Sequence, residues 1–263
     1  TIFTVVGRKQ IYIQGNYKYN IIMIEVINHI YTQRFFAKKT KFSDLFKAVT
    51  YTQYEGKTIP FWYKKIPGET STLNLTLPTD ALLSAMKSNT RNEIRRAEKE
   101  NCLFEYNYDY KSFVPFYNEF CKSKGMEDKI NEHTLEKYNR TLITMAKRGN
   151  TVLAMHATVI NKEDKEAMLL YSCSTRLNTD VDKKLIGWSN RFLHYQEFML
   201  FKKWGIERYE WNGICTNPEL RDVYNISLFK LSFGSEAKPQ LNLRTPLFVL
   251  FKELQKLLKK MRK

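Results

Sequence analysis

Short alternating patterns of hydrophobic and polar residues dominate the beginning of the chain and predict β-strands. Apolar runs at residues 3–6 and 11–13 flank a Gly-Arg-Lys turn. In residues 73–77, leucine alternates with polar residues, which is the period of a strand with one buried face. Residues 66–69, Ile-Pro-Gly-Glu, form a strong turn sequence, so residues 59–64 and 73–77 are predicted to be the two arms of a hairpin.

Helical spacing of apolar residues begins after Pro78. Thr79 or Asp80 can cap a helix that starts at residue 81, and the capping-box sequence Thr90-Arg91-Asn92-Glu93 predicts a second helix that ends near Asn101. The further predicted elements are helices at 113–125 and 135–149, strands at 151–160 and 167–173, a helix at 185–204, a strand at 209–211, a helix at 224–233 and a strand near 240–243. This order predicts an α/β fold with a mixed sheet and a binding site at the carboxyl ends of its strands.

The composition is that of a globular protein. The chain has 263 residues, of which 43% are hydrophobic and 27% are charged. No apolar run approaches the ~20 residues that a bilayer-spanning helix needs. Residues 1–6 are followed by Arg8 and Lys9, which is not the charged-then-apolar order of a signal peptide. We therefore predict a cytoplasmic protein, with a membrane-peripheral location as the alternative.

Cysteine and histidine do not form a recognisable metal or disulfide pattern. There is no CxxC pair and no HxxxH or HExxH spacing. The residues concerned are Cys102, Cys121, Cys173 and Cys215, and His29, His133, His156 and His194. We expect reduced, buried cysteines without disulfide partners, and no metal site.

The net charge of +16 is the strongest compositional signal. Residues 1–47 hold eight Lys or Arg against two acidic residues, and residues 247–263 hold six against one. Such a balance favours anionic partners, namely nucleic acid, phosphorylated small molecules or an acidic membrane face. A lysine-rich soluble surface is the alternative explanation for either cluster.

Three segments carry a more specific pattern. Residues 86–99 (MKSNTRNEIRRAEK) are similar to the helix K-x-R-x-x-I-R-x-A-E-K, and residues 209–214 (YEWNGI) to the strand end Y-D-x-x-G-I. Residues 224–234 (YNISLFKLSFG) resemble I-Y-x-F-K-x-x-F-G with a longer insertion. In order and spacing the set resembles the Fem-type (FemABX) aminoacyltransferases, which build the peptidoglycan interpeptide bridge.

This resemblance implies a GNAT fold, that is, an acyl-CoA N-acyltransferase-like mixed sheet flanked by helices. Residues 1–79 would form a smaller β-rich N-terminal part, and residues 80–263 the transferase domain. The implied function is transfer of an acyl or aminoacyl group to an amine of a cell-envelope precursor, either a muropeptide or an amino sugar of a surface glycan. The donor would be aminoacyl-tRNA or acyl-CoA, with no tightly bound cofactor, and the acceptor a phosphorylated or lipid-linked amine. The alternatives are an acyl-CoA-dependent amino-sugar N-acetyltransferase and a basic RNA- or membrane-binding module.

Ordinary acetyltransferases hold the pyrophosphate of coenzyme A on a glycine-rich loop that opens a helix. The corresponding residues here, 174–184, contain no glycine. Asp180 and Asp182 are expected to cap the following helix, and a carboxylate at that end disfavours phosphate. We therefore expect no coenzyme A pyrophosphate on this segment.

The resemblance also suggests catalytic residues. The Phe-Lys pair of the Fem-type enzymes lies in the donor channel, where the lysine supplies positive charge at the reacting carbonyl, and this role carries over to Phe229 and Lys230. Without the resemblance, Lys230 reads as a surface lysine beside a core phenylalanine. Glu210 matches the family's Asp and is a candidate for acid-base chemistry or for orienting the amine. A structural, hydrogen-bonded carboxylate is the alternative for Glu210.

Four further residues are candidates for substrate binding. Arg91 and Arg95 are four apart on one helical face, where they could hold a phosphate. An ion pair with Glu98 is the alternative. Tyr171 ends a strand where such folds bind substrate, and Tyr224 belongs to the third family motif. A structural role is the alternative for each tyrosine.

Residues 246–263 repeat apolar side chains at three- and four-residue steps, with lysines between them. The pattern predicts an amphipathic helix that packs on its own domain. The alternative is contact with an anionic membrane, such as the inner membrane surface.

Overall fold

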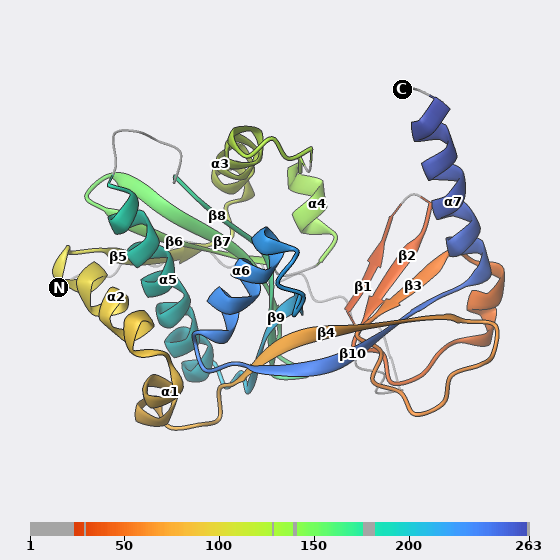
Figure 1. Ribbon diagram of the computed structural model, residues 1–263, viewed down its shortest axis with the longest axis horizontal. Coiled ribbons are helices and arrows are strands. Elements are labelled where there is room, and N and C mark those ends of the chain that lie inside the picture. The colour runs from red at the N-terminus through yellow and green to blue at the C-terminus, as the bar shows by residue number, and fades with distance from the viewer. Residues whose placement is uncertain (1–23, 29, 128, 139–140, 176–181, 262–263) are drawn as a thin grey trace, which may run out of the picture.

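The protein forms one ten-stranded mixed sheet with helices on both faces (Figure 1). The computed structural model describes residues 24–28, 30–127, 129–138, 141–175 and 182–261. The strands are β1 (Ile24–Ile27), β2 (Thr32–Phe35), β3 (Val49–Thr52), β4 (Lys64–Asn74), β5 (Leu103–Asn107), β6 (Thr141–Arg148), β7 (Thr151–Asn161), β8 (Glu166–Ser174), β9 (Arg208–Ile214) and β10 (Glu236–Arg244). Their order in the sheet is β1-β2-β3-β10-β4-β9-β8-β7-β6-β5.

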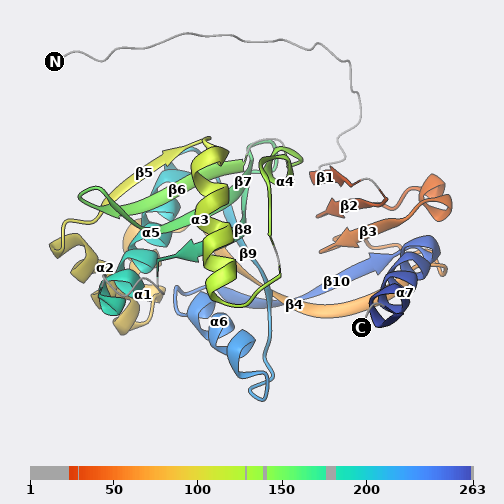
Figure 2. The ribbon, with the colours of Figure 1, turned by 90° about the horizontal axis from the view of Figure 1, so that it is seen from above.

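The helices divide between the two faces of the sheet. They are the 3₁₀ helix η1 (Phe42–Phe46), α1 (Thr79–Ala85), α2 (Ser88–Lys99), α3 (Tyr110–Ser123), α4 (Glu132–Glu136), α5 (Lys183–Lys203), α6 (Arg221–Leu231) and α7 (Pro246–Met261). The long helix α5 packs across β6, β7 and β8 with α2 beside it, whereas α3 covers β7 and β8 from the opposite face (Figures 1 and 2). Each face has its own apolar core, with Phe198 and Trp211 on the α5 side and Phe113 on the α3 side.

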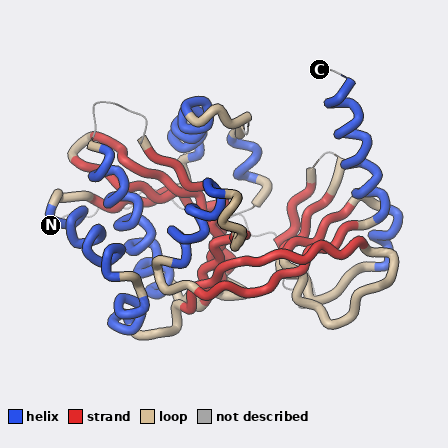
Figure 3. The backbone as a smooth tube through the Cα atoms, in the orientation of Figure 1, coloured by secondary structure: helices blue, strands red, loops and turns tan. Residues whose placement is uncertain are grey.

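Two long strands join the halves of the molecule. β4 and β10 run side by side from the helix-covered half to the smaller lobe formed by β1, β2, β3, η1 and α7 (Figure 3). β10 pairs with β3 in that lobe, and β4 pairs with β9 in the other half. One sheet therefore contains strands from both sides of residue 79, the predicted domain boundary. The predicted strands at residues 3–6 and 11–13 lie outside the described residues.

The predicted hairpin around Pro67-Gly68 is wrong, because both residues lie inside the continuous strand β4. Pro67 pairs with Leu241 and Gly68 with Gln240 of β10. Proline lacks a donor N–H and is tolerated in a strand where one edge has no ladder partner. The β9 ladder begins only at Glu69, so β4 has that free edge at Pro67.

The predicted helix at 135–149 is also wrong. Only the short α4 is helical, and residues 141–148 form β6, between β5 and β7. Residues 141–146 are all buried. A strand that is buried on both faces has no alternating pattern, and a short apolar run of this kind cannot be distinguished from a helix by spacing.

The two predicted helix starts near Pro78 and Thr90 differ from the structure in their caps. α1 begins at Thr79 after Pro78, without a side-chain cap. α2 begins at Ser88, so Thr90 is inside the helix and donates a 2.9 Å hydrogen bond to Ser232 Oγ instead of forming a capping box. Thr90 therefore bonds to the distant Ser232 in place of the nearby residues of a capping box.

The predicted strands at 151–160 and 167–173, the helix at 185–204 and the strand at 209–211 are confirmed as β7, β8, α5 and β9. They belong to one unit, with α5 packed across the sheet. β8 and β9 are parallel and pair only from Glu166–Arg208 to Met168–Glu210. Beyond that point the ladder ends and the two strands diverge.

Candidate active site

The split between β8 and β9 is the feature around which the candidate site is built. The ladder ends at the pair Met168–Glu210. The partner of β7 then shifts from Leu169 to Tyr171, so Leu170 forms a bulge at the same point. Asn212 spans the gap, since its Nδ2 donates a 2.6 Å hydrogen bond to the carbonyl oxygen of Leu169. Its φ of +61° turns the end of β9, a conformation that asparagine adopts more readily than most residues.

Glu210 is buried in a polar network beside Asn212. Its Oε1 accepts a hydrogen bond from Thr70 of β4 and a 2.8 Å bond from the backbone N–H of Asn212. Gln53, which follows β3, donates from Nε2 to both Thr70 and Asn212 at 3.3 Å. Burial raises the pKa of Glu210, and the hydrogen bonds from Thr70 and Asn212 partly offset that effect. Glu210 thus helps to hold Asn212 across the split.

Lys230 reaches the same place from the last turn of α6. Its Nζ donates a 2.7 Å hydrogen bond to the carbonyl oxygen of Gly213 and lies 3.5 Å from that of Asn212. The side chain is half-buried, and burial lowers its pKa to about 8, while the charge of Glu210 acts in the opposite direction. Lys230 is therefore a positioned lysine, in contrast to the surface residue that the alternative interpretation predicted.

Phe229 faces the core next to Lys230. Its ring centroid lies 5.3 Å from that of Phe233 and 5.7 Å from that of His194. The guanidinium carbon of Arg191 lies 4.9 Å from the Phe229 centroid, and Arg191 forms a 2.8 Å ion pair with Glu93 of α2. The aromatic packing of α6 thus determines where Lys230 stands.

Arg91 and Arg95 have different surroundings. Arg91 Nη1 donates to the backbone oxygen of Met86 and, at 3.4 Å, to that of Leu83, so it binds carbonyls at the C-terminal end of α1. Arg95 is exposed on α2. Their predicted binding of phosphate stays a prediction.

The two tyrosines occupy different places. Tyr171 pairs with Ala157 and packs at 4.8 Å, centroid to centroid, on Tyr117 of α3, so it lies on the α3 face of the sheet. Tyr224 is half-buried in the first half of α6, the helix that carries Lys230. A role of either in binding substrate stays a prediction.

The start of α5 bears on the choice of donor. Asp182 is the N-cap, and its carboxylate accepts a 2.9 Å hydrogen bond from the backbone N–H of Lys184. The expected cap is therefore confirmed for Asp182. Asp180 and the rest of residues 176–181 lie outside the described residues, so the expected absence of a pyrophosphate loop stays a prediction there.

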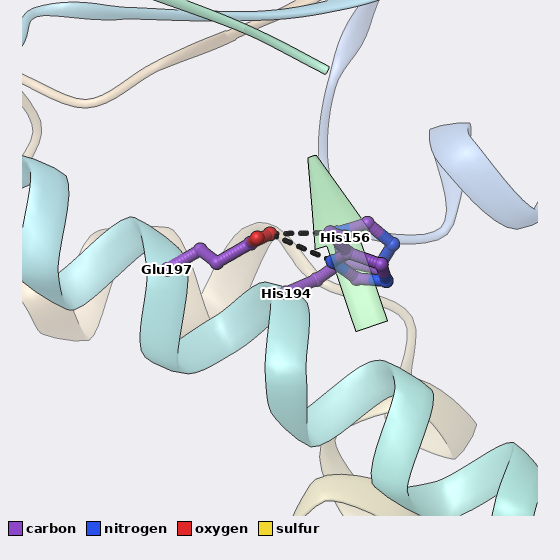
Figure 4. Close-up of side chains that lie close together, drawn as sticks. All are labelled: His156, His194 and Glu197. Carbon is purple, nitrogen blue, oxygen red and sulfur yellow. Dashed lines mark hydrogen bonds and ion pairs between the residues drawn. The ribbon is translucent and has the colours of Figure 1, made fainter. Parts of the chain in front are cut away.

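A second polar cluster lies between β7 and α5 (Figure 4). His156 of β7 and His194 of α5 direct their Nδ1 atoms at Glu197 Oε2, at 3.1 and 3.2 Å. Their rings stack with centroids 4.0 Å apart. Thr144 donates to the other carboxylate oxygen, and Tyr209 lies 3.4 Å from Oε2. His156, His194 and Glu197 are all buried.

Burial and charge set the ionisation of this cluster. Burial, together with the neighbouring His156, lowers the pKa of His194 to about 3. Burial alone would raise the pKa of Glu197, but the charge of His156 and hydrogen bonds from both histidines lower it to about 2. Glu197 is therefore the buried anion that these donors surround.

The ligand atoms of His156, His194 and Glu197 lie within 4.8 Å of one another, so among the described residues they are a set that could hold a metal ion. The Glu197 oxygens already have hydrogen-bond donors, which accounts for the cluster without an ion. Sequence spacing did not reveal it, because His156 is far from the other two residues along the chain. The only local signal was His194-x-x-Glu197 on a predicted helix.

The network around Asn212 was likewise missed, although the Asn212-Gly213 pair marks the end of a strand. Thr70 and Gln53 come from parts of the chain about 140 or more residues away along the sequence from Asn212. Neither carries a local motif.

Comparison with solved structures identifies the architecture. FemX superposes with a TM-score of 0.62 at 12% identity, over 88% of this chain and 85% of FemX. L-PGS from Bacillus licheniformis gives a TM-score of 0.55 at 14% identity, over 85% of this chain and 80% of that one. The C-terminal domain (DUF2156) of a candidate lysylphosphatidylglycerol synthetase from Agrobacterium fabrum gives 0.55 at 12% identity, over 87% and 83%.

The chain has a FemABX/GNAT-like fold. No protein-family model matches its sequence, and neither does any curated protein. In this FemABX/GNAT-like fold the split β8–β9 pair, Lys230 and the Glu210 network occupy one region, at the junction of the two halves of the sheet.

Proposed function

We propose that this protein transfers an acyl or aminoacyl group to an amine on a cell-envelope precursor. The observation that carries the proposal is the position of Lys230, a half-buried lysine held against the end of β9 where β8 and β9 diverge. The likeness to FemX and to L-PGS supports a transferase of this kind. One neighbour bears the name of a lysylphosphatidylglycerol synthetase, which supports an acceptor that carries phosphate.

The chemistry needs a positive charge at the reacting carbonyl. The acceptor amine attacks the carbonyl carbon and forms the new C–N bond, and the π electrons move to the carbonyl oxygen. When this intermediate collapses, the C–O or C–S bond to the donor breaks, and the proton lost by the amine ends on the leaving group. An ammonium beside the developing oxyanion stabilises the transition state more than the ground state.

Lys230 has the required geometry and charge. An ammonium has three N–H donors, and the carbonyl oxygens of Gly213 and Asn212 engage two of them. The third can be directed at a substrate oxygen. Glu210 favours the charged form of Lys230 and holds Asn212 in place, which makes it a positioning residue in this proposal.

Aminoacyl-tRNA is the preferred donor. The carboxylate of Asp182 already occupies the amide end of α5, where an acyl-CoA pyrophosphate would bind in an ordinary acetyltransferase. The net charge of +16 favours an anionic donor and an acceptor with phosphate or pyrophosphate. Phe229, Arg91, Arg95, Tyr171 and Tyr224 are the further residues that we propose for donor or acceptor contacts.

Single-turnover transfer tests the proposal. The protein is mixed with radiolabelled aminoacyl-tRNA or acetyl-CoA and with a nucleotide-linked muropeptide or amino sugar, and the product is separated by chromatography. Transfer from aminoacyl-tRNA that falls in Lys230→Ala supports the proposal. Transfer from acetyl-CoA to the amino sugar would identify the alternative enzyme. Binding of RNA or vesicles with no transfer from any donor would identify a basic binding module.

A further inference from the structure

The C-terminal helix α7 contacts the rest of the protein almost entirely through its first turns. Phe248 is buried, and its ring centroid lies 5.3 Å from that of Tyr31. Phe251 continues this contact at 6.1 Å, and Thr245 caps the helix by accepting from the backbone N–H of Phe248 at 3.3 Å. The later turns extend away from the sheet (Figure 1, upper right). The prediction that the whole apolar stripe packs on its own domain is therefore wrong.

The stripe itself is uncovered by any described residue. Six of its side chains are between 43% and 82% exposed. They are Leu247, Leu250, Leu254, Leu257, Leu258 and Met261. At 100° per residue they cover an arc of ~100° on one side of the helix. A continuous apolar surface of this size marks an interaction site.

The opposite side of α7 is basic. Lys252, Lys256 and Lys260 lie there, and the one acidic side chain, Glu253, forms a 2.9 Å ion pair with Lys256. An apolar face opposite a lysine face is the pattern of a helix that lies in a membrane interface. Among the described residues, no helix is long and apolar enough to cross a membrane.

A second apolar feature lies beside the base of α7. The 3₁₀ helix η1 contacts α7, and its Phe42 and Phe46 are 69% and 71% exposed. Phe61 is 92% exposed and stacks edge-on against Trp62, which in turn contacts Phe42. The exposed lysines around η1 are Lys38, Lys39, Lys41 and Lys47. Aromatic rings among lysines are suited to the headgroup region of an anionic bilayer.

We propose that the leucine stripe of α7, together with Phe42 and Phe46 of η1, binds the surface of an anionic lipid bilayer. The helix inserts its leucines below the headgroups, and the surrounding lysines contact lipid phosphates. This docking surface lies on the smaller lobe, away from α6, the helix that carries Lys230 (Figure 1). The inference does not depend on the proposed transfer reaction, although it would bring a lipid-linked acceptor to the protein.

A second copy of the chain is a poorer occupant of this surface. The seam of a two-helix coiled coil has two apolar positions per heptad, but Phe251 and Leu258 widen this stripe beyond that. The flanking positions carry Lys260 and Glu253, of which Glu253 is already paired. Two chains of net charge +16 also repel each other, whereas the same charge attracts an anionic membrane.

Vesicle co-sedimentation tests this proposal. The probes are vesicles of phosphatidylcholine alone and of phosphatidylcholine with an equal part of phosphatidylglycerol. We expect the protein to sediment with the second vesicles only, and more weakly as salt rises. The double variant Leu254→Asp/Leu257→Asp should bind at least tenfold more weakly. Leu103→Asp is the matched control, because Leu103 is equally exposed but lies on β5.

The same variants distinguish binding of a bilayer from binding of a second copy of the chain. The substituted leucines are half exposed, so the double variant should keep the wild-type Tm. Light scattering that shows a wild-type dimer, dissociated by Leu254→Asp/Leu257→Asp, would assign the stripe to a second copy and overturn the proposal. Failure of the wild type to bind anionic vesicles would do the same. Undiminished vesicle binding by the double variant would show that lysines elsewhere bind the lipid and that the stripe has no part in it.

Discussion

Lys230 Nζ lies 2.7 Å from the carbonyl oxygen of Gly213, which ties the last turn of α6 to the end of β9. A lysine on a free helix surface samples many rotamers, but backbone carbonyls hold this one at a defined point. That point is the place where β8 and β9 separate. The contact thus converts a flexible cation into a fixed one, and three predictions about catalysis follow from it.

Removing the Lys230 ammonium should slow the chemical step. Loss of one oxyanion donor typically lowers turnover by ~10²–10³, so we expect Lys230→Ala to reduce single-turnover transfer by about that factor. Lys230→Arg should restore only part of the rate, since a planar guanidinium cannot occupy the position of a compact ammonium. The exposed Lys122→Ala is the control. A near-wild-type rate in Lys230→Ala would remove Lys230 from the mechanism.

Phe229→Ala separates packing from charge at the same site. Phe229 contacts His194, Trp211 and Phe233. Its loss should lower stability by roughly 3–5 kcal/mol and the rate with it, because α6 no longer holds Lys230 in place. Urea denaturation and the transfer assay measure the two effects. A large loss of rate at unchanged stability would instead indicate direct contact of Phe229 with the donor.

Transfer should decline at alkaline pH. The pKa of Lys230 is lowered to about 8 from its ordinary value of 10.5. The ammonium is present below about pH 8 and is lost above it, so the single-turnover rate should fall as pH rises through 8. In Lys230→Arg the residual rate should show no such decline, because arginine stays protonated. An alkaline limb that persists unchanged in Lys230→Arg would assign that ionisation to another group.

Asn212 should matter both for its side chain and for its backbone conformation. Asn212→Ala leaves the Leu169 carbonyl without its donor and puts alanine, which adopts a positive φ less readily than asparagine, at φ +61°. We expect a loss of ~1–3 kcal/mol in the free energy of unfolding. Asn212→Gly relieves the backbone strain but not the lost hydrogen bond, so it should be intermediate. Equal stability of all three proteins in urea would mean that the strands diverge without this bridge.

The buried Glu197 should be central to stability. Glu197→Ala leaves His156, His194 and Thr144 without their common acceptor, which should cost ~3–5 kcal/mol. The control Glu207→Ala removes an exposed ion pair with Lys165 and should cost ~0–1 kcal/mol. If a chelator lowers the Tm of the wild type as much as Glu197→Ala does, the cluster holds a metal ion in addition to its hydrogen bonds.

Acid should destabilise the protein through the same cluster. The pKa of His194 is lowered from 6.5 to about 3 in the folded protein. Between these two pH values the unfolded chain binds a proton that the folded chain does not, so the protein becomes less stable as the pH decreases. The pKa of Glu197 is lowered from 4.5 to about 2, so its contribution is present above 4.5 and is lost as pH falls toward 2. Calorimetric Tm should therefore drop from pH 6.5 downward. His194→Phe should flatten the dependence above pH 4.5, and an unchanged slope there would contradict the assignment.

The long elements and the nature of the fold followed from local pattern. α3, α5, β7 and β8 each carry a clear period and an end signal, such as the positive φ of Gly205 after α5. Three short motifs in the right order indicated a FemABX/GNAT-like fold, and one of them contained Lys230. These features are readable because they depend on neighbours within a few residues.

Tertiary structure decided the rest, because the partners are distant along the chain. Pro67-Gly68 reads as a turn, yet it is drawn into β4 by pairing with β10. The leucines of α7 read as a packed face, but nothing described lies over them. The sequence could nominate Lys230 and Glu210, but only the fold brings Thr70 to Glu210 and His156 to Glu197. Buried polar groups take whichever partner the folded chain delivers, and local pattern holds no record of that choice.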